Sequence, residues 1–434
     1  MATSPDAAKA QRLEAVHALI SQRVDARERA LLDTFARGYF QRIDPEDVLE
    51  RSADDLYGAL LSHWQFARKR EPGQPKIRVF NPVAGEHGWG SRHTVIEIVN
   101  DDMPFLVDTT SMEVNRQGLA LQLIVHPMFA VQRDASGQLT ALATREEQPD
   151  WPRESFMHVE VDRLADPAIR AALAAGVERV LGDVRAAVTD WKAMVAQLRA
   201  VIAEVDAKPP PLPRDEVAES RAFLQWVAED HMLLLGYRQH ELSSSGDEIA
   251  LKRVPGSGLG ILRESELGPA ESTSFAVVPR EARALASSPS PMLLLTKANS
   301  RSTVHRPGYI DYLGIKRYGP DGRVVGEHRF VGLLTSAAYS ARVAEIPLLR
   351  GKVQQLIERA GYAPESHLGK ALTHVLETYP RDELFQATAD ELYEIANGIL
   401  QLGERQRFRL FIRRDPFERF ISCLIFVPRE NYTT

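Results

Sequence analysis

The chain contains 434 residues; hydrophobic residues make up 44% and charged residues 26%, and the formal net charge is −6. This length suffices for about two to four domains, and the composition is typical of a globular protein. A net acidic chain without a run of about 18 apolar residues gives no reason to expect nucleic acid or a membrane as a partner. The single cysteine, Cys423, excludes an intrachain disulfide framework and predicts a reducing, cytoplasmic location.

Residues 1–75 are predicted to form a helical hairpin. Apolar residues recur at steps of three and four between Ala7 and Phe40, as in a helix that buries one face. Asp44 and Pro45 then provide an N-cap followed by proline at the first helical position, which predicts the start of a second helix.

Residues 76–207 are predicted to form an α+β domain. After a short strand at Lys76–Pro82, the chain from His93 has a strand, a helix and two strands. A further strand follows, and then a long helix that Asp166-Pro167 opens and that runs toward Val205. This order is the ferredoxin-like split βαβ arrangement. The expected strands are Lys76–Pro82, His93–Val99, Leu119–Gln132, Gln138–Ala143 and Phe156–Val161, and the expected first helix is Phe105–Gly118.

A second α+β domain is predicted at residues 214–345, after the proline-rich linker Lys208–Pro213. It begins with a helix at residues 215–230, and an antiparallel sheet follows. Gly319-Pro320-Asp321-Gly322 is the expected turn between two of its strands, because proline presets φ and Asp-Gly accepts positive φ. The expected strands are Leu233–Leu242, Glu248–Val254, Met292–Thr296, Tyr309–Tyr318 and Arg323–Thr335.

Residues 346–404 are predicted to form a linker of three helices, and residues 405–434 begin with strands at Arg407–Ile412 and Phe420–Val427. Two strands are too few for an independently stable sheet, which predicts the start of a further, truncated domain. Cys423 lies in the apolar second strand and is predicted to be a small core side chain rather than a nucleophile. The predicted fold class is therefore α+β and multidomain.

The first candidate site is the loop between the strand His93–Val99 and the helix that follows it. Backbone N–H groups at a helix N-terminus are unpaired and favour anions, so a small carboxylic acid could bind there. The alternative is that Asp102 simply caps the helix. The candidate ligand-binding residues are Asn100, Asp101, Asp102, Met103, Pro104, Phe105 and Leu106.

The second candidate site is a run of cations with interleaved hydroxyl and amide side chains. Such a run suits a carboxylate or a phosphate, and the alternative is a solvated loop whose charges point to water. The candidate anion-binding residues are Lys297, Arg301, His305 and Arg306.

No motif predicts catalysis or a metal site in this chain. The twelve histidines are scattered, and no His-Glu-x-x-His pair occurs. The loop Gly256–Gly260 is rich in glycine, but Ile261 follows it where a dinucleotide fingerprint would continue toward a helix. We therefore predict no catalytic residues, no metal and no cofactor in this segment.

Four stretches carry a resemblance to a known family. They are GSGLGILRE from Gly256, LLLTKANSRSTVHRPGYIDYLGIKRY from Leu293, GRVVGEHRFVGLLTSAAYS from Gly322 and DPFERFISCLIFVPRENYTT from Asp415. With them the chain, from about His93 onward, resembles the N-terminal part of the large bacterial NAD-dependent glutamate dehydrogenases. The resemblance implies ACT-like regulatory modules, a sensor-like α+β module and helical linkers. It places the dehydrogenase core, which uses NAD, further along the parent chain.

The resemblance also gives the first candidate loop a template. The ACT loop of this kind reads Asp-Arg-Pro-Gly-Leu-Leu, and Asp102-Met103-Pro104-Phe105-Leu106-Val107 stands at the matching positions. Phe105 replaces the glycine that lets the backbone approach a ligand closely. This replacement favours a structural or interface role over amino-acid binding.

The preferred hypothesis is a non-catalytic regulatory and assembly segment of a glutamate dehydrogenase. Its expected partners are the catalytic domain of its own full-length chain, further copies in a homo-oligomer, and an amino-acid or small-carboxylate effector. The alternatives are an independent amino-acid-binding protein with ACT-like domains and a free-standing enzyme of another type. Within the preferred hypothesis, a scaffold role is favoured over a sensor role because of Phe105.

Overall fold

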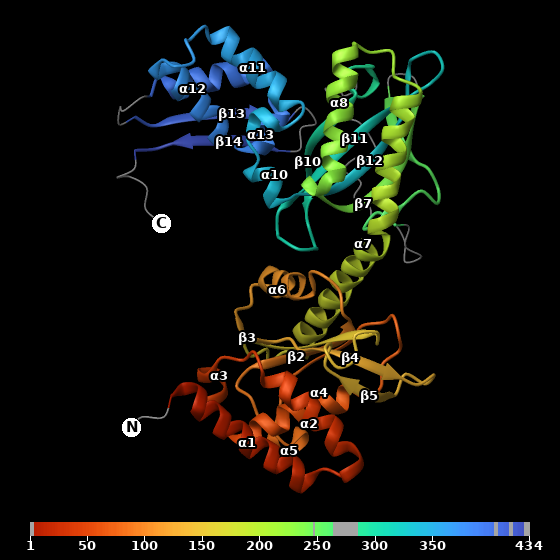
Figure 1. Ribbon diagram of the computed structural model, residues 1–434, viewed down its shortest axis with the longest axis vertical. Helices are drawn as coiled ribbons and strands as arrows, with labels where there is room; N and C mark the ends of the chain where they lie inside the picture. Colours follow the sequence, from red (N-terminus) through yellow and green to blue (C-terminus); the bar gives the residue numbers. More distant parts are fainter. Residues whose placement is uncertain (1–3, 246–247, 264–284, 403–406, 416–419, 429–434) are drawn as a thin grey trace. The chain divides into compact units, whose positions relative to one another are not determined.

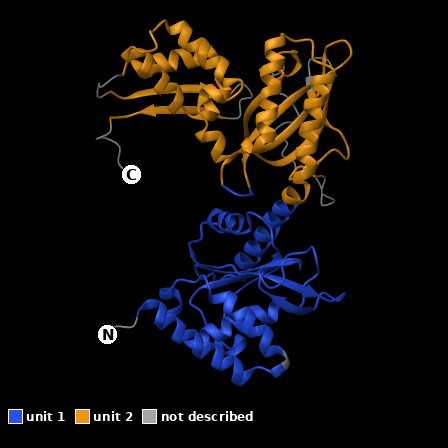
Figure 2. Ribbon diagram, in the orientation of Figure 1, with its two compact units in different colours: residues 1–185, 303–306 blue, residues 186–302, 307–434 orange. Residues whose placement is uncertain are grey.

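The computed structural model describes residues 4–245, 248–263, 285–402, 407–415 and 420–428. The chain divides into two compact units, residues 1–185 with 303–306 and residues 186–302 with 307–434 (Figure 2). The division falls at Arg185, inside the long helix α7 (Pro167–Ala207), rather than at the linker Lys208–Pro213. No helix among the described residues is long and apolar enough to cross a membrane.

The first unit is built on an antiparallel sheet, as the predicted α+β class requires. The order of its strands is β1-β2-β6-β4-β5, and β3 also pairs with β6. The predicted strand Leu119–Gln132 is wrong as one element. Pro127 has no N–H to donate to a neighbouring strand, and two separate strands form on either side of it. The strands are β1 (Lys76–Phe80), β2 (Thr94–Asp101), β3 (Leu121–Val125), β4 (Met128–Arg133), β5 (Leu139–Ala143) and β6 (Arg153–Val161).

The edge of this sheet departs from the predicted strand order. A ferredoxin-like unit ends on a strand that comes after its second helix. In the part of the chain that the structure describes, no strand after α7 joins the first sheet. Instead β1, which precedes the β2-α6-β3 portion, pairs with β2. The β2-α6-β3 and β6-α7 portions keep the predicted order.

Helices cover both faces of the first sheet (Figure 1). The N-terminal helices α1 (Pro5–Arg23), α2 (Ala26–Phe40), α3 (Pro45–Leu49) and α4 (Ala53–Ala67) pack against one face, and α6 (Leu106–Arg116) and α7 lie against the other. Alternation along β2 assigns the faces: Glu97 bonds to Ser62 of α4, whereas Asn100 bonds to Arg185 of α7. The sheet is therefore buried in a three-layer arrangement.

The N-terminal region has more helices than the predicted hairpin. The predicted helix Ala7–Phe40 breaks after Arg23, where Val24 is extended, to give α1 and α2. Asp44 is confirmed as an N-cap and accepts a hydrogen bond from the Glu46 N–H at 2.9 Å. The helix that it opens ends at Leu49, however, and Ser52 caps α4 separately. A short helix, α5 (Ala84–His87), was not predicted.

The second unit is built on another antiparallel sheet. Its order is β10-β11-β12-β7-β8, and β9 also pairs with β7. The predicted turn at Gly319–Gly322 is confirmed: the Gly319 N–H donates to the Arg323 carbonyl, and Gly322 has a φ of 77°. The elements are α8 (Arg214–Trp226), the π-helical turn η1 (Val227–His231), β7 (Met232–Ser245), β8 (Glu248–Arg253), β9 (Leu259–Gly260), β10 (Leu293–Arg301), β11 (Tyr309–Tyr318) and β12 (Val324–Leu334).

The C-terminal part of the second unit is mostly helical. Among the described residues, four helices rather than three follow Ile346. The segment predicted as the third helix breaks at Ala387, and Thr388 caps a new helix together with Glu391. The elements are α10 (Ser336–Ser340), η3 (Val343–Glu345), α11 (Leu349–Ala360), α12 (His367–Thr378), α13 (Arg381–Gln386), α14 (Ala389–Leu400), β13 (Arg409–Arg414) and β14 (Ile421–Phe426). The expected boundary at residue 405 lies outside the described residues.

The strands β13 and β14 pair antiparallel and leave one apolar face open. Leu410 lies opposite Ile425 and Ile412 lies opposite Cys423. The side chains of Leu410, Ile412 and Ile425 are more than half exposed, and Cys423 is exposed as well. Cys423, predicted to be a core side chain, is therefore exposed among the described residues, because alternation puts it on the face that the two strands leave open.

An aromatic cluster fills the layer between the N-terminal helices and the first sheet. The ring of Phe35 lies 5.3–5.4 Å from the rings of Trp64, Phe129 and Phe156, and its side chain is fully buried. Aromatic pairs at this spacing add to the free energy gained from burial alone. Phe35 thus joins α2 to α4, β4 and β6.

Phe35→Ala should lower the free energy of unfolding of the first unit by about 3–5 kcal/mol, because the surrounding rings cannot collapse into the space. Denaturant unfolding followed by tryptophan fluorescence measures this change. Val83→Ala is the matched control, since Val83 is 48% exposed, and it should change stability by no more than about 0.5 kcal/mol. Equal effects of the two substitutions would contradict the assignment of this core.

Candidate functional site

The loop after β2 carries an unusual backbone conformation. Phe105 is the N-cap residue of α6, with φ 73° and ψ 4°, and its side chain makes no capping hydrogen bond. The alternative that Asp102 caps this helix is therefore wrong. A left-handed conformation costs a residue with a side chain about 1–2 kcal/mol relative to a right-handed one. Phe105 thus adopts the conformation that a glycine would supply at this position.

The first two predicted residues of this loop are held by the protein itself. Asn100 is buried, and its Oδ1 accepts from Arg185 Nη2 at 2.5 Å. The carboxylate of Asp101 lies 2.5 Å from Arg70 Nη2 and 2.6 Å from Arg185 Nη1. Burial acts to raise the pKa of Asp101, but the hydrogen bonds from both arginines outweigh it and lower that pKa below its ordinary value. Asn100 and Asp101 therefore position the loop.

The remaining predicted residues line a cavity of about 430 Å³. Asp102, Met103, Pro104, Phe105 and Leu106 form one side. The other side comes from His126, Met128 and Arg153, which the sequence analysis did not single out. The pairing of β4 with β6 brings these three residues to the loop, and no sequence motif marks that long-range contact.

The chemistry of this cavity suits a small anion. The N-terminus of α6 lines the cavity and offers backbone N–H groups, and Arg153, which is 44% exposed, supplies a positive charge. Asp102 lies 3.9 Å from the Arg153 guanidinium and competes with such a ligand. Burial lowers the pKa of His126, so this imidazole is neutral near pH 7 and bonds to the Ser155 hydroxyl at 2.7 Å.

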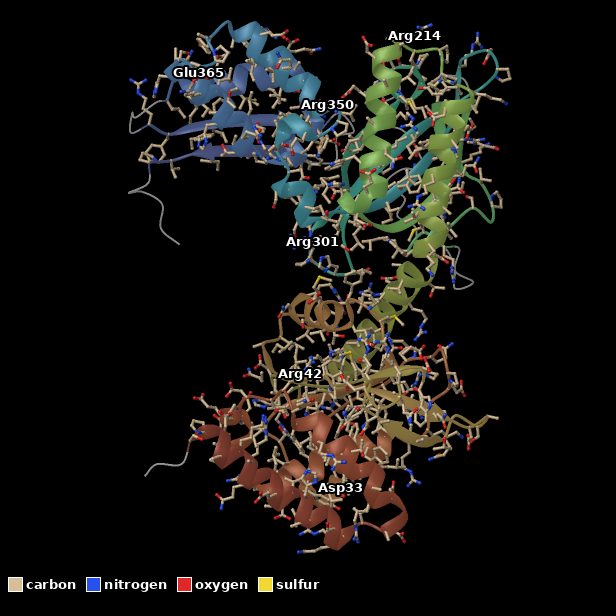
Figure 3. The ribbon with its side chains drawn as sticks, in the orientation of Figure 1. Asp33, Arg42, Arg214, Arg301, Arg350 and Glu365 are labelled. Carbon is tan, nitrogen blue, oxygen red and sulfur yellow. The ribbon has the colours of Figure 1, made fainter. Side chains whose placement is uncertain are left out.

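The four cations of the second candidate site are divided between the two units. Lys297 and Arg301 belong to the second unit, whereas His305 and Arg306 cluster with the first. Arg301 is the last residue of β10 (Figure 3). Its guanidinium lies 5.3 Å from the centre of the Tyr309 ring. The His305 ring lies 5.0 Å from that of Phe105, within the first unit.

Lys297 has carboxylates around it. Its Nζ lies 2.5 Å from Asp311 and 3.1 Å from Asp382. Burial acts to lower the pKa of Lys297, but these two carboxylates outweigh it and raise that pKa above its ordinary value. A charge already matched in this way is poorly placed to receive an anionic ligand.

The glycine-rich loop is likewise occupied by internal contacts. The Gly260 N–H donates to Asp190 Oδ2 at 2.8 Å, and Arg263 pairs with the same carboxylate. A phosphate would need such N–H groups to be free. The loop therefore closes an end of the second sheet, where Leu259 and Gly260 pair with β7.

Three family models match this chain. They are described as "Glutamate dehydrogenase, ACT1 domain" at residues 35–177, "Glutamate dehydrogenase, helical motif 1" at residues 346–405 and "Glutamate dehydrogenase, ACT2 domain" at residues 409–434. Together with the antiparallel sheets, these matches define a multidomain α+β chain with ACT domains.

Curated relatives give a narrower assignment. The chain is 40% identical to the NAD-specific glutamate dehydrogenase of Halomonas elongata over 96% of its length. It is 36% identical to that of Pseudomonas aeruginosa over 100% of its length, and 30% identical to that of Mycobacterium tuberculosis over 86%. Over most of its length the chain is therefore similar to NAD-specific glutamate dehydrogenases. It spans 26%, 27% and 22% of these relatives, respectively.

Phe105→Gly should be more stable than Phe105→Ala by about 1 kcal/mol, because alanine keeps the left-handed strain and glycine does not. Both variants lose the same ring, so their difference isolates the backbone. Chemical denaturation of the two variants side by side measures it. Ala172, exposed on α7, is the control with the opposite expected sign. Ala172→Gly should lower the free energy of unfolding by roughly 0.5–1 kcal/mol. The same sign at both positions would refute the strained backbone.

Lys297→Met should destabilise the second unit by about 3 kcal/mol at pH 7, because it leaves Asp311 buried without its cation. Burial raises the pKa of Asp311, so its neutral form becomes populated as the pH falls toward that raised value. The loss of unfolding free energy caused by Lys297→Met should therefore be smaller at pH 5 than at pH 7. Urea unfolding at both pH values measures this change.

Two controls accompany the Lys297 variant. Lys297→Met combined with Asp311→Asn should recover part of the loss, since asparagine can still accept the Leu334 N–H. Lys370→Met, at an exposed ion pair with Glu365, should change stability by no more than about 0.5 kcal/mol. A deficit that grows on acidification would show that Asp311 is not the group left unpaired.

Proposed function

We propose that residues 1–434 are the non-catalytic regulatory and assembly segment of an NAD-dependent glutamate dehydrogenase. The observation that carries this proposal is the nature of the matched models, two ACT domains and a helical motif of that enzyme family. The parent enzyme would oxidatively deaminate L-glutamate to 2-oxoglutarate and ammonia with NAD. NAD would bind in a catalytic domain encoded elsewhere in the parent chain, which is this segment's first partner.

The finer architecture follows the same proposal. Residues 76–207 act as an ACT-like domain, residues 214–345 as a sensor-like domain and residues 346–404 as a helical linker. Residues 405–434 begin a second ACT-like domain. The exposed apolar face formed by Leu410, Ile412, Ile421 and Ile425 supports the last assignment, since further strands or helices of such a domain would cover it.

A scaffold role is favoured over a sensor role within this proposal. Asn100 and Asp101 are engaged by Arg70 and Arg185, and Phe105 places a ring where a glycine would leave room for a ligand. Edge strands suit assembly, because an edge has unpaired backbone groups. The strand β1 pairs only with β2 among the described strands and presents a partly exposed edge. A cytoplasmic homo-oligomer is the expected assembly.

Sedimentation of residues 1–434 tests the assembly role, and it should show a species of at least twice the 48.5 kDa chain mass. Ile77→Pro removes an N–H in the middle of β1 and should weaken association through that edge. Ala53→Pro, at the first position of α4 where proline is tolerated, is the matched control. A strictly monomeric segment at about 100 μM would contradict the scaffold role, because specific assemblies bind well below this concentration.

Two further measurements separate the remaining candidates. The segment mixed with glutamate and NAD should produce no NADH; steady turnover would refute the non-catalytic assignment. Titration with amino acids tests the alternative of an independent amino-acid-binding protein. A ligand at 100 times its dissociation constant adds about 2.7 kcal/mol to stability, which a thermal unfolding assay detects. A monomeric segment with such a shift would favour that alternative.

A further inference from the structure

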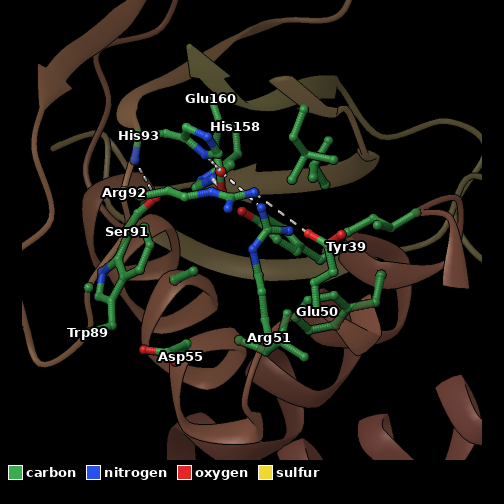
Figure 4. A pocket seen from close by; sticks show the side chains of 17 residues that line it. Tyr39, Glu50, Arg51, Asp55, Trp89, Ser91, Arg92, His93, His158 and Glu160 are labelled. Carbon is green, nitrogen blue, oxygen red and sulfur yellow. Dashed lines mark hydrogen bonds and ion pairs between the residues drawn. The ribbon is translucent and has the colours of Figure 1, made fainter. Parts of the chain in front are cut away.

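A second cavity, of about 490 Å³, interrupts the packing between the first sheet and the helices α1–α4, here called the helical cover. Its wall comes from α2, α4 and the connection between α3 and α4, from residues 89–93, and from β3 and β6 (Figure 4). Arg92 and Glu50 on this wall are 80% and 70% exposed, so solvent enters the cavity. The buried residues Tyr39 and His158 also line it, and solvent therefore comes close to the inner side of the cover.

One histidine of the helical cover is enclosed without a hydrogen bond. His63 of α4 is fully buried, and neither nitrogen of its ring has a hydrogen-bond partner among the described residues. The centre of its ring lies 6.1 Å from that of Phe35, 5.8 Å from that of Tyr39 and 6.1 Å from that of Phe156. Unpaired polar atoms in a protein interior are rare and costly, because they have given up their bonds to water. Packing alone therefore does not account for a histidine inside this aromatic cage.

A second histidine faces His63 from the sheet. The centre of the His158 ring, on β6, lies 6.4 Å from that of His63, and the His158 side chain is 2% exposed. His158 Nε2 bonds to Glu160 at 3.2 Å, and His158 Nδ1 has no partner among the described residues. Glu160 also accepts from Arg51 and His93, so its charge is matched without His63. A positive charge on one of the two facing rings would oppose a positive charge on the other.

The other charged groups around His63 give it no counter-charge, as far as the structure describes them. Arg78 of β1 is a cation and acts against a second positive charge. Glu97 of β2 accepts from Arg78 Nε at 2.7 Å and from the Ser62 hydroxyl at 3.3 Å, so its charge is already matched. Burial raises the pKa of Tyr39 well above its ordinary value, and its phenol stays neutral. A proton on His63 would therefore be an unmatched buried charge.

This environment makes the closed cover sensitive to acid. Burial lowers the pKa of His63 well below its ordinary value of 6.5, and the neighbouring His158 and Arg78 lower it further. The backbone of Ile98 acts the other way and is outweighed. After the cover has opened, the same ring would titrate in water at about pH 6.5. The contribution of neutral His63 to the closed form is therefore fully present above about pH 6.5 and is lost as the pH falls below it.

We propose that the helical cover is an acid-opened lid on the first sheet, and that protonation of His63 is the event that opens it. The open form gains population on acidification because His63 takes up a proton only there, and the second cavity gives water a way toward it. Opening bares the rings of Phe129 and Phe156 on the sheet. The proposal rests on the geometry of the first unit alone, so it can fail separately from the regulatory role proposed above.

Hydrogen exchange of residues 1–434 measures this opening, from the most protected amides of α2 and α4 after correction for the intrinsic exchange rate at each pH. Because one proton is taken up on opening, the opening constant should rise about tenfold between pH 7.5 and pH 5.5, and about thirtyfold by pH 5.0. Amides of both helices should show the same rise, since the two helices leave the sheet together.

Two variants and a matched control identify the group responsible. His63→Phe keeps an aromatic ring in the cage and removes the titrating group, so its opening constant should change by less than about twofold over this pH range. His63→Leu is the second variant, because the larger phenylalanine ring can strain a packed site. His17→Gln, on α1, is the control: His17 is 35% exposed and bonds to Asp33 at 2.9 Å, and its loss should leave the pH dependence of the wild type.

The ring signals of His63 in NMR spectra give a reading that needs no variant. In the closed cover they should stay those of a neutral imidazole at pH 5.5. Protonation of His63 at about pH 6.5 without faster exchange in α4 would show that the closed cover accepts the charge, and would overturn the proposal. An opening constant that does not change with pH would overturn it as well, and so would an equal rise in the wild type and the His63 variants.

Discussion

A buried network of charges fixes the structure around the end of β2. Glu154 of β6 accepts from Arg70 at 2.7 Å and from Arg133 at 2.7 Å, and all three side chains are at most 5% exposed. Arg70 extends the network to Asp101, which Arg185 of α7 also holds. Removal of one partner from such a network leaves a buried charge unmatched. The network therefore joins the end of α4, three strands and α7 at the base of the candidate loop.

The same sheet explains why polar groups gather beneath the N-terminal helices. Glu97, His158 and Glu160 point toward that helical layer from β2 and β6, and each is buried. These buried polar groups need hydrogen-bond donors, so apolar side chains alone cannot make up the helical layer that covers them. Arg78 from β1 and Arg51 after α3 supply such donors. Helical cover and polar strand residues together produce the second cavity.

Local signals in the sequence identified most elements of the fold but few of its long-range contacts. Asp44 and the turn Gly319–Gly322 were predictable, because a cap and a reverse turn depend on adjacent residues. The pairing of Asp101 with Arg185, 84 positions away, depends on how α7 packs, and no motif records it. The exposed position of Cys423 was missed because an apolar strand was assumed to be covered on both faces.

The candidate sites show the same limit. Five of the seven predicted loop residues line one cavity, whereas the arginines that hold the other two could be found only from the fold. The run of cations from Lys297 looked like an anion site because its acidic partners are distant in sequence. Asp311 lies 14 positions after Lys297 and Asp382 lies 85 positions after it, and only strand pairing and helix packing bring them together.

Phe105 bears on the choice between a sensor and a scaffold. A side chain in the left-handed region persists only where the surrounding structure over-determines it. Here the network at Asp101 holds one end of the loop, α6 holds the other, and the ring of Phe105 lies 5.0 Å from that of His305. The ring thus gains contacts that offset the backbone cost. It also occupies space beside the N-terminus of α6, so the loop is better built for packing than for the close approach of a ligand.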